Sequence, residues 1–323
     1  MPYWELVTRS FAITWRHRYL WLLALFAGES GGGASVNYSS PVQSNTSPGR
    51  LPDFASYPQQ AAHWLSHNFG VVVVGSVLFV VLGIAFFVLA AVCEGALVRA
   101  SAEHDAQRPF GLGRAWQSGV ATMGTIIRFR LLLIALGLPV FIVVLGLVAG
   151  LVLAILNHDT GLAVALGLLA LLVFLAAIVY AIYLSLLDRL GTRAVVLELL
   201  RARASLGRGH RLLVKRLGRV LLVWLLSIVT TIVVGIGAAI VLAILVLPVV
   251  FAGAAAYMAG SPLLGLVIAV AVLILLPVVL VVGGFLAAQM STYWTVAFRR
   301  LELDQPPPYG YLYQATPPAA PTA

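Results

Sequence analysis

The sequence predicts an all-α fold, a polytopic transmembrane helical bundle. Of its 323 residues, 61% are hydrophobic and only 10% are charged, whereas soluble globular proteins contain about 25% charged residues. Uncharged apolar runs recur along the chain, and roughly 20 such residues in a helix cross a hydrocarbon core. Of the 20 Lys and Arg residues, all but Arg50 lie between these runs on one predicted side. We therefore expect about six spans in three hairpins, with cytoplasmic amphipathic helices.

The first expected span, residues 11–28, is the least apolar. Arg16 and Arg18 fall in its early half, so a spanning helix requires both side chains to extend to the headgroups. Trp15 suits the aromatic belt at a membrane surface. An alternative is a secretory signal cut near Ala34, because a basic start, a short apolar core and small residues downstream fit that plan.

The later spans have clearer boundaries. Residues 28–58 are rich in Gly, Ser, Pro and Asn, which predicts a mobile outer loop. Residues 251–262 are rich in Ala, Gly, Ser and Pro and divide a long uncharged stretch into a helical hairpin. Residues 1–303 therefore form one transmembrane domain, and residues 304–323 form a disordered Pro-rich cytoplasmic tail. The remaining expected spans are 69–93, 131–156, 161–187, 220–250 and 263–298.

The basic residues orient the predicted bundle. Cytoplasmic connections carry an excess of Lys and Arg, so both termini are expected in the cytoplasm, with outer connections at 28–68, 157–160 and 251–262. Arg greatly outnumbers Lys, and Ala, Gly, Leu and Val dominate the composition. This composition favours a bacterial plasma membrane. The arginines flank spans and do not form one exposed patch with interleaved aromatic residues, so no nucleic-acid partner is expected.

A shift of 94 residues aligns two parts of the chain. It places Glu94 on Asp188, Arg99 on Arg193, and residues 112–114 on the same Leu-Gly-Arg tripeptide at residues 206–208. Internal repeats are frequent in transporters. The alternative is the duplication of a helix-pair module with no consequence for transport.

Basic residues at spacings of three and four lie on one face of the predicted helix from Ser205 to Arg219. Near an anionic surface each basic residue contributes roughly 1 kcal/mol, so these side chains are candidates for binding lipid headgroups. The alternative is that they only enforce orientation. The candidates are Arg208, Arg211, Lys215 and Arg219.

Two acidic residues lie at inner span ends, each with an arginine five residues later. We expect interfacial ion pairs between Glu94 and Arg99 and between Asp188 and Arg193. Ionisable residues within the hydrocarbon would mark proton or substrate routes, and the sequence places none at mid-membrane depth. Proton-coupled transport is disfavoured accordingly.

Histidines in the outer connections are the one candidate metal arrangement. His63 and His67 lie one helical turn apart, and His158 and Asp159 lie in another outer connection. Imidazoles at that spacing can share a zinc ion, but Trp64 follows His63 where a zinc protease has glutamate. We favour an interfacial helix there, and expect no metal, cofactor or catalytic residue.

Three segments carry a resemblance to a known group. The stretch from Ser10 to Gly28, the Ser205-to-Arg208 approach to a span, and the Thr292-to-Leu301 segment look like those of uncharacterised bacterial six-span proteins. That group is similar to the membrane domain attached to some glycerophosphoryl diester phosphodiesterases. The resemblance implies a helical membrane module that handles or senses lipid. It transfers no catalytic residue, because the sequence contains no stretch that resembles their soluble barrel domain.

The sequence thus favours a non-enzymatic integral membrane protein, either a lipid-facing module or a subunit of a membrane complex. Its expected partners are the bilayer, including anionic lipids, and a membrane protein or a second copy of itself. The alternative is a permease or channel for an uncharged or lipid-like substrate, suggested by the repeat and by Pro139, Pro248 and Pro277 within spans. A metal-dependent enzyme at the outer face is the weakest candidate.

Overall fold

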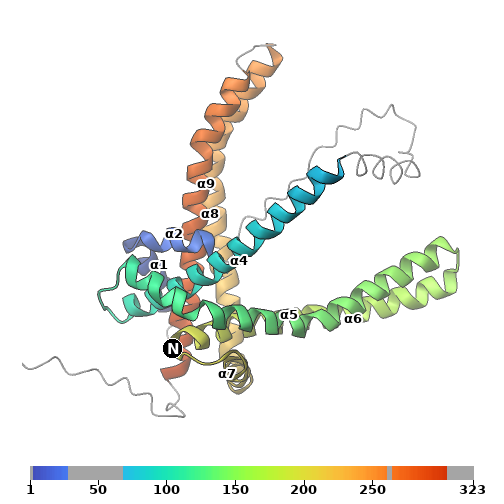
Figure 1. Cartoon of the computed structure of the whole chain (residues 1–323), viewed down its shortest axis with the longest axis horizontal. Helices are drawn as coiled ribbons and strands as arrows, with labels where there is room; N and C mark the ends of the chain where they lie inside the picture. The colour runs from blue at the N-terminus through green and yellow to red at the C-terminus, as the bar shows by residue number, and fades with distance from the viewer. Residues whose placement is uncertain (1–2, 28–67, 260–263, 304–323) are drawn as a thin grey trace, which may run out of the picture.

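The computed structural model describes residues 3–27, 68–259 and 264–303, and all regular structure in this part of the chain is α-helical (Figure 1). The predicted all-α class is confirmed. The helices are α1 (Tyr3–Arg16), α2 (Tyr19–Phe26), α4 (Phe69–Asp105), α5 (Leu112–Leu156), α6 (Thr160–Leu197), α7 (Ala202–Lys215), α8 (Leu217–Met258) and α9 (Leu264–Leu303).

Five helices among the described residues, α4, α5, α6, α8 and α9, are long and apolar enough to cross a membrane. The chain is therefore a multi-pass membrane protein. The shortest of the five has 37 residues, which at a rise of 1.5 Å per residue gives about 55 Å. The hydrocarbon core is only about 30 Å thick, and α4, α5 and α6 each extend well beyond the span that the sequence predicted, whereas α9 nearly coincides with its predicted span.

The structure differs from the expected six spans at residues 11–28, which do not form one helix. α1 has 14 residues and α2 has 8, so they are only about 21 and 12 Å long. The turn between them contains the run Arg16-His17-Arg18, and both arginines are exposed. A corner here leaves both charges exposed, whereas charge placed within hydrocarbon would be costly. α1 and α2 both pack against α9.

Each long helix has one end in a compact assembly and another that extends away from it (Figure 1). We call the extended parts the arms: 69–88 of α4, 131–156 of α5 with 160–185 of α6, and 231–258 of α8 with 264–283 of α9. The base consists of α1, α2, α7 and the remaining parts of the long helices. In α4, α5, α6 and α8, the most apolar 18-residue window contains no buried residue.

α9 runs through the centre of the base. Its Tyr293 and Trp294 side chains have no exposed surface. The Tyr293 hydroxyl donates a hydrogen bond of 2.8 Å to the carbonyl oxygen of Val223 on α8, and the Thr292 hydroxyl lies 3.0 Å from that of Ser101 on α4. The Thr292-to-Leu301 segment is thus the centre of the core, which explains its mixture of aromatic and small polar residues.

Candidate functional site

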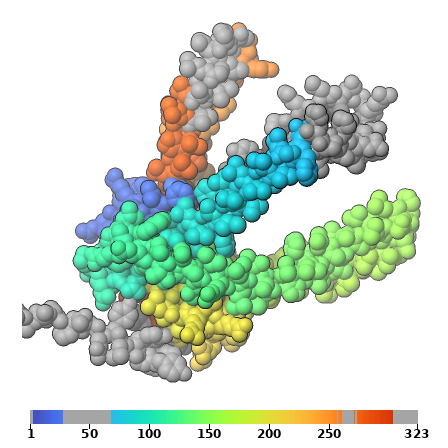
Figure 2. Space-filling view, in the orientation of Figure 1, coloured from blue at the N-terminus to red at the C-terminus, as the bar shows by residue number. Residues whose placement is uncertain are grey.

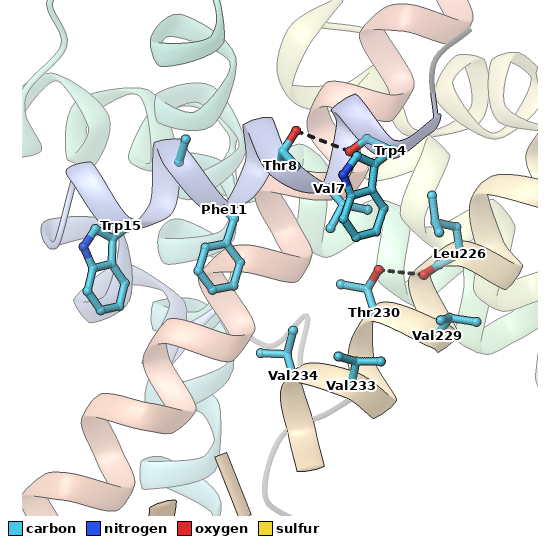
Figure 3. Close-up of a pocket in the computed structure, with 11 residues that line it drawn as sticks. Trp4, Val7, Thr8, Phe11, Trp15, Leu226, Val229, Thr230, Val233 and Val234 are labelled. Carbon is cyan, nitrogen blue, oxygen red and sulfur yellow. Dashed lines mark hydrogen bonds between the residues drawn. The ribbon is translucent and has the colours of Figure 1, made fainter. Parts of the chain in front are cut away.

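An apolar groove of about 650 Å³ lies between α1 and α8 (Figure 3). One face of each helix lines it. Trp4 and Leu226 lie near one end, and Trp15 lies at the other. The lining residues are Trp4, Val7, Thr8, Phe11, Ala12 and Trp15 of α1, and Leu226, Val229, Thr230, Val233 and Val234 of α8.

The spacing of residues in α1 creates the groove face. The lining positions recur every three or four residues, which places them on one side of a helix. The opposite side carries Leu6, Ser10, Ile13 and Thr14, which are buried in the base. The groove side stays open, and Trp4 and Trp15 are 71% and 61% exposed. Large exposed aromatic side chains of this kind suit the surface layer of a bilayer.

The two hydroxyl groups in the groove bond to their own helices. The Thr8 hydroxyl donates to the Trp4 carbonyl oxygen at 3.3 Å, and the Thr230 hydroxyl donates to that of Leu226 at 2.8 Å. Both appear in Figure 3. Because these hydroxyls are satisfied, the groove wall suits an apolar ligand better than a polar one.

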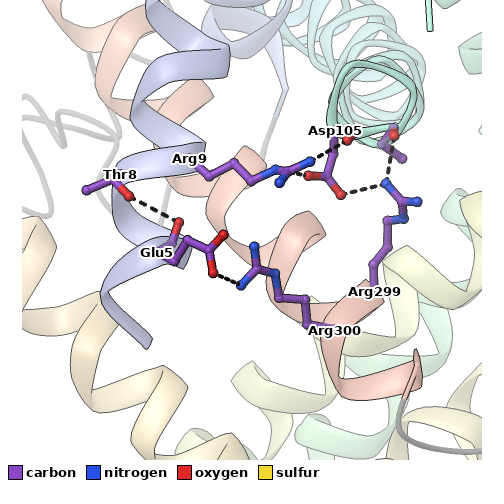
Figure 4. A network of polar contacts seen from close by, with 7 residues as sticks. Glu5, Thr8, Arg9, Asp105, Arg299 and Arg300 are labelled. Atoms are coloured by element: carbon purple, nitrogen blue, oxygen red, sulfur yellow. Dashed lines mark hydrogen bonds and ion pairs between the residues drawn. The ribbon is translucent and has the colours of Figure 1, made fainter. Parts of the chain in front are cut away.

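Ion pairs fix α1 against the base (Figure 4). Asp105 at the end of α4 accepts from Arg9 of α1 at 2.5 Å and from Arg299 of α9 at 2.6 Å. Glu5 of α1 accepts from Arg300 at 3.0 Å, and this hydrogen bond and the Arg300 charge lower the pKa of Glu5. The α1 wall of the groove is therefore attached to both α4 and α9.

A second contact between segments far apart in the chain joins the α1–α2 corner to α4. The rings of His17 and His104 stack with centroids 3.6 Å apart and planes 7° from parallel, and the Tyr19 hydroxyl lies 2.6 Å from Nε2 of His104. Burial, followed by the Arg16 charge, lowers the pKa of His17. Burial raises the pKa of Tyr19 to about 12.

The structure separates the four lipid-headgroup candidates. Arg208 is buried inside the base, where it donates to Glu198 at 3.2 Å and to Glu302 at 3.0 Å. Arg211, Lys215 and Arg219 are exposed. The buried face of α7 packs on α6, so its amphipathic pattern serves protein packing in addition to any contact with lipid.

Both residues of the first predicted ion pair have further partners of opposite charge. Glu94 accepts from Arg130 on α5, and Arg99 pairs with Glu103 at 2.9 Å. The predicted pairing of Glu94 with Arg99 stays a prediction.

The other predicted pair lies near the centre of the base. Arg193 is fully buried and donates to the carbonyl oxygens of Arg189 and Ser291 at 2.8 and 3.4 Å. Asp188 accepts from the Thr192 hydroxyl at 3.5 Å. The pairing of Asp188 with Arg193 likewise stays a prediction.

The candidate metal residues do not come together as one described cluster. His63 and His67 lie outside the described residues. Asp159 accepts from the backbone N–H of Leu162 at 3.1 Å and so caps the start of α6. Within residues 3–27, 68–259 and 264–303, no three His, Cys, Asp or Glu side chains are grouped so that they could hold a metal ion.

Sequence reasoning missed the groove because it treated residues 11–28 as a span. The stripe of Trp4, Val7, Phe11 and Trp15 was the available signal, since it marks an amphipathic helix that starts before residue 11.

A second apolar pocket of about 670 Å³ lies between α2, α4 and α5 and includes Cys93 and Trp116 in its lining.

Comparison with known protein families shows that residues 7–298 match a family described as being of unknown function, DUF7544. Neither the curated proteins nor the solved structures gave a match.

Proposed function

The chain belongs to the family of unknown function DUF7544, and we propose that it is a non-enzymatic, lipid-facing module of a bacterial plasma membrane. The observation that supports this proposal is the exposure of the arms. Four of the five long helices bury nothing in their most apolar window, and the arms diverge from the base (Figure 2). Apolar surface of this extent requires an apolar environment on several sides, and the lipid bilayer supplies it.

The charge distribution supports an orientation with the base in the cytoplasm. Every Lys and Arg that the structure describes lies in a helix of the base or in a connection between two of its helices, and cytoplasmic segments are enriched in these residues. Both chain termini would then face the cytoplasm. The turn between α5 and α6 would lie at the outer surface.

The acidic side chains of the described residues support a structural role in place of a catalytic one. Six of them accept from arginine side chains: Glu5, Glu94, Glu103, Asp105, Glu198 and Glu302. The other two accept from a hydroxyl or a helix N–H: Asp188 and Asp159. The contacts of Glu5, Glu94, Asp105, Glu198 and Glu302 join different elements of the base. Those of Glu103, Asp159 and Asp188 are made with residues nearby in the sequence. The suggested likeness to a phosphodiesterase membrane domain would fit a lipid-linked role without catalysis.

The alternative function is a permease or channel for an uncharged or lipid-like substrate. It is favoured by Pro139, Pro248 and Pro277, which lie inside α5, α8 and α9 within the arms. The proposed internal repeat would pair α4 and the start of α5 with α6 and α7. A transport route would require water between the arms, which makes the two functions separable by experiment.

Site-directed spin labelling in liposomes tests the proposal. Cys93 is the single cysteine and is buried, so a Cys93→Ala background permits one label at a time. Labels replace Phe79, Val179 and Ile244, which are 79%, 69% and 67% exposed. We expect collisions with oxygen at all three positions and exclusion of a water-soluble nickel chelate. Arg211→Cys on the base is the control, with nickel access expected.

Two results would contradict the proposal. Nickel access at the arm positions would indicate a water-filled route and favour transport. Loss of oxygen access in native membrane vesicles, with oxygen access retained in liposomes, would show that a partner subunit or a second copy covers the arms.

A further inference from the structure

The groove between α1 and α8 lies where the base gives way to an arm. The α8 wall of the groove runs from Leu226, in the base, to Val234, in the arm, and so changes from base to arm between Thr230 and Val233. If the arms lie in lipid, this change marks the level at which headgroups meet acyl chains. The groove is therefore open to lipid at the depth where a chain begins.

The size and lining of the groove suit a flexible apolar ligand. Its volume of about 650 Å³ falls within the roughly 300–1,000 Å³ of small-molecule sites. Aliphatic side chains of α8 form one wall, and aromatic rings of α1 form much of the other (Figure 3). An apolar lining with few polar groups accepts an acyl chain without leaving polar atoms unpaired.

A positive charge continues the groove toward the base. Arg219 precedes Leu226 by seven residues, which is nearly two helical turns, or about 10 Å along α8. It therefore lies on the same face of α8 as Leu226 and Val233, and it is exposed. On the α1 side, Glu5 is engaged by Arg300, which offsets the nearest negative charge of that helix. A guanidinium binds phosphate oxygens strongly through paired N–H donors.

We propose that the α1–α8 groove binds an anionic phospholipid, with one acyl chain between Trp4 and Val233 and its phosphate at Arg219. This inference rests on the proposed lipid-facing function and adds the class of lipid and its site. In this proposal the groove lining holds the acyl chain, and Arg219 makes the site prefer a negatively charged headgroup.

Native mass spectrometry of the full chain released from detergent tests the proposal. The protein is titrated with phosphatidylglycerol or with phosphatidylcholine that carries the same chains. We expect one phosphatidylglycerol to bind more tightly than phosphatidylcholine. Arg219→Gln should reduce that preference about fivefold, which corresponds to the roughly 1 kcal/mol that one basic residue contributes at an anionic surface. Arg203→Gln removes an equal, exposed charge on α7 and should leave the preference unchanged.

Filling the groove tests the chain site separately. Ala12→Trp places an indole in the groove from α1, and Val233→Trp does so from α8. Because both positions are exposed, the fold should be retained, as an unchanged melting temperature would show. Each should abolish the tight phosphatidylglycerol adduct, whereas Val241→Trp on the α8 arm should retain it.

An adduct that persists in both groove-filled variants would overturn the proposal. Equal binding of the two lipids, unaffected by Arg219→Gln, would also overturn it. Neither result changes the expected oxygen access of the arms, so failure of this site is distinguishable from failure of the lipid-facing function. A second copy in the groove would appear as a dimer that Ala12→Trp dissociates, and this outcome too would contradict a lipid occupant.

Discussion

The indole N–H of Trp21 donates a hydrogen bond of 2.8 Å to the carbonyl oxygen of Thr14 across the corner between α1 and α2. Thr14 lies in the last turn of α1, where helix carbonyls have no partner within the helix. The bond therefore supports both the end of α1 and the direction of α2. It also explains how a stretch that resembles a short span instead forms two helices against the base.

Loss of this hydrogen bond should weaken the corner. Trp21→Phe keeps an aromatic ring but removes the donor, and we expect a loss of about 1 kcal/mol in the free energy of unfolding. Thermal unfolding in detergent measures the effect. Trp116→Phe, at a 43% exposed position on α5, is the control. Equal melting temperatures for the two variants would show that the Trp21 bond contributes nothing.

Close packing of α4 against α5 depends on Gly119. A Cβ atom at this position would lie 2.2 Å from the carbonyl oxygen of Val92, and backbone atoms cannot move aside cheaply. Gly119→Ala should therefore destabilise the base by about 1–3 kcal/mol, as overpacking does. Gly124→Ala on the same helix meets nothing within 4 Å and should be neutral or stabilising by about 0.5–1 kcal/mol. Matching losses of melting temperature would contradict the packing argument.

The ion pair between Glu94 and Arg130 should be costly to break from one side. Glu94 is 1% exposed, so Arg130→Met leaves its carboxylate without this partner, and such losses cost about 3–5 kcal/mol. We expect the double variant Glu94→Gln with Arg130→Met to recover part of that loss. Arg128→Met, at an exposed position two residues away, should change stability little. Unfolding midpoints of the wild type, the single variants Glu94→Gln and Arg130→Met, and the double variant give the coupling, and additive losses would contradict direct pairing.

Stability should depend on pH through His17. Burial and the Arg16 charge lower its pKa in the folded state, so the unfolded chain binds the proton more readily. The free energy of unfolding is therefore retained above about pH 6.5, the ordinary histidine value, and decreases as pH falls below it. Protonation of both stacked rings, His17 and His104, would add repulsion. Melting temperatures between pH 8 and 5 test this, and His17→Phe should show a smaller decrease. An equal decrease in the variant would assign the effect to other groups.

Much of the helix pattern was predictable because it depends on local composition. Residues 131–156 and 161–187 were expected to span and lie within α5 and α6. Arg208 shows the limit of the same approach. Its spacing with Arg211 and Lys215 suggested one shared basic face, but the structure turns Arg208 toward Glu198 and Glu302. Acidic partners 10 and 94 residues away carry no periodic signal.

The groove was unpredictable for the same reason. Its walls come from residues near position 10 and near position 230, and no pattern in either segment specifies that they face each other. The break of the first apolar stretch at His17 was equally hidden. Whether this stretch forms one helix or two depends on whether the tertiary fold leaves Arg16 and Arg18 exposed at a corner.

The sequence by itself determined that this protein is helical and crosses a membrane several times. Hydrocarbon accepts only segments whose backbone hydrogen bonds are satisfied internally and whose side chains are apolar, and both properties are local. The tertiary structure alone decided that α1 stays in the base, that Glu94 meets Arg130, and that an apolar groove opens between α1 and α8. These features depend on contacts between distant segments, whose energies come from shape and charge brought together only when the chain folds.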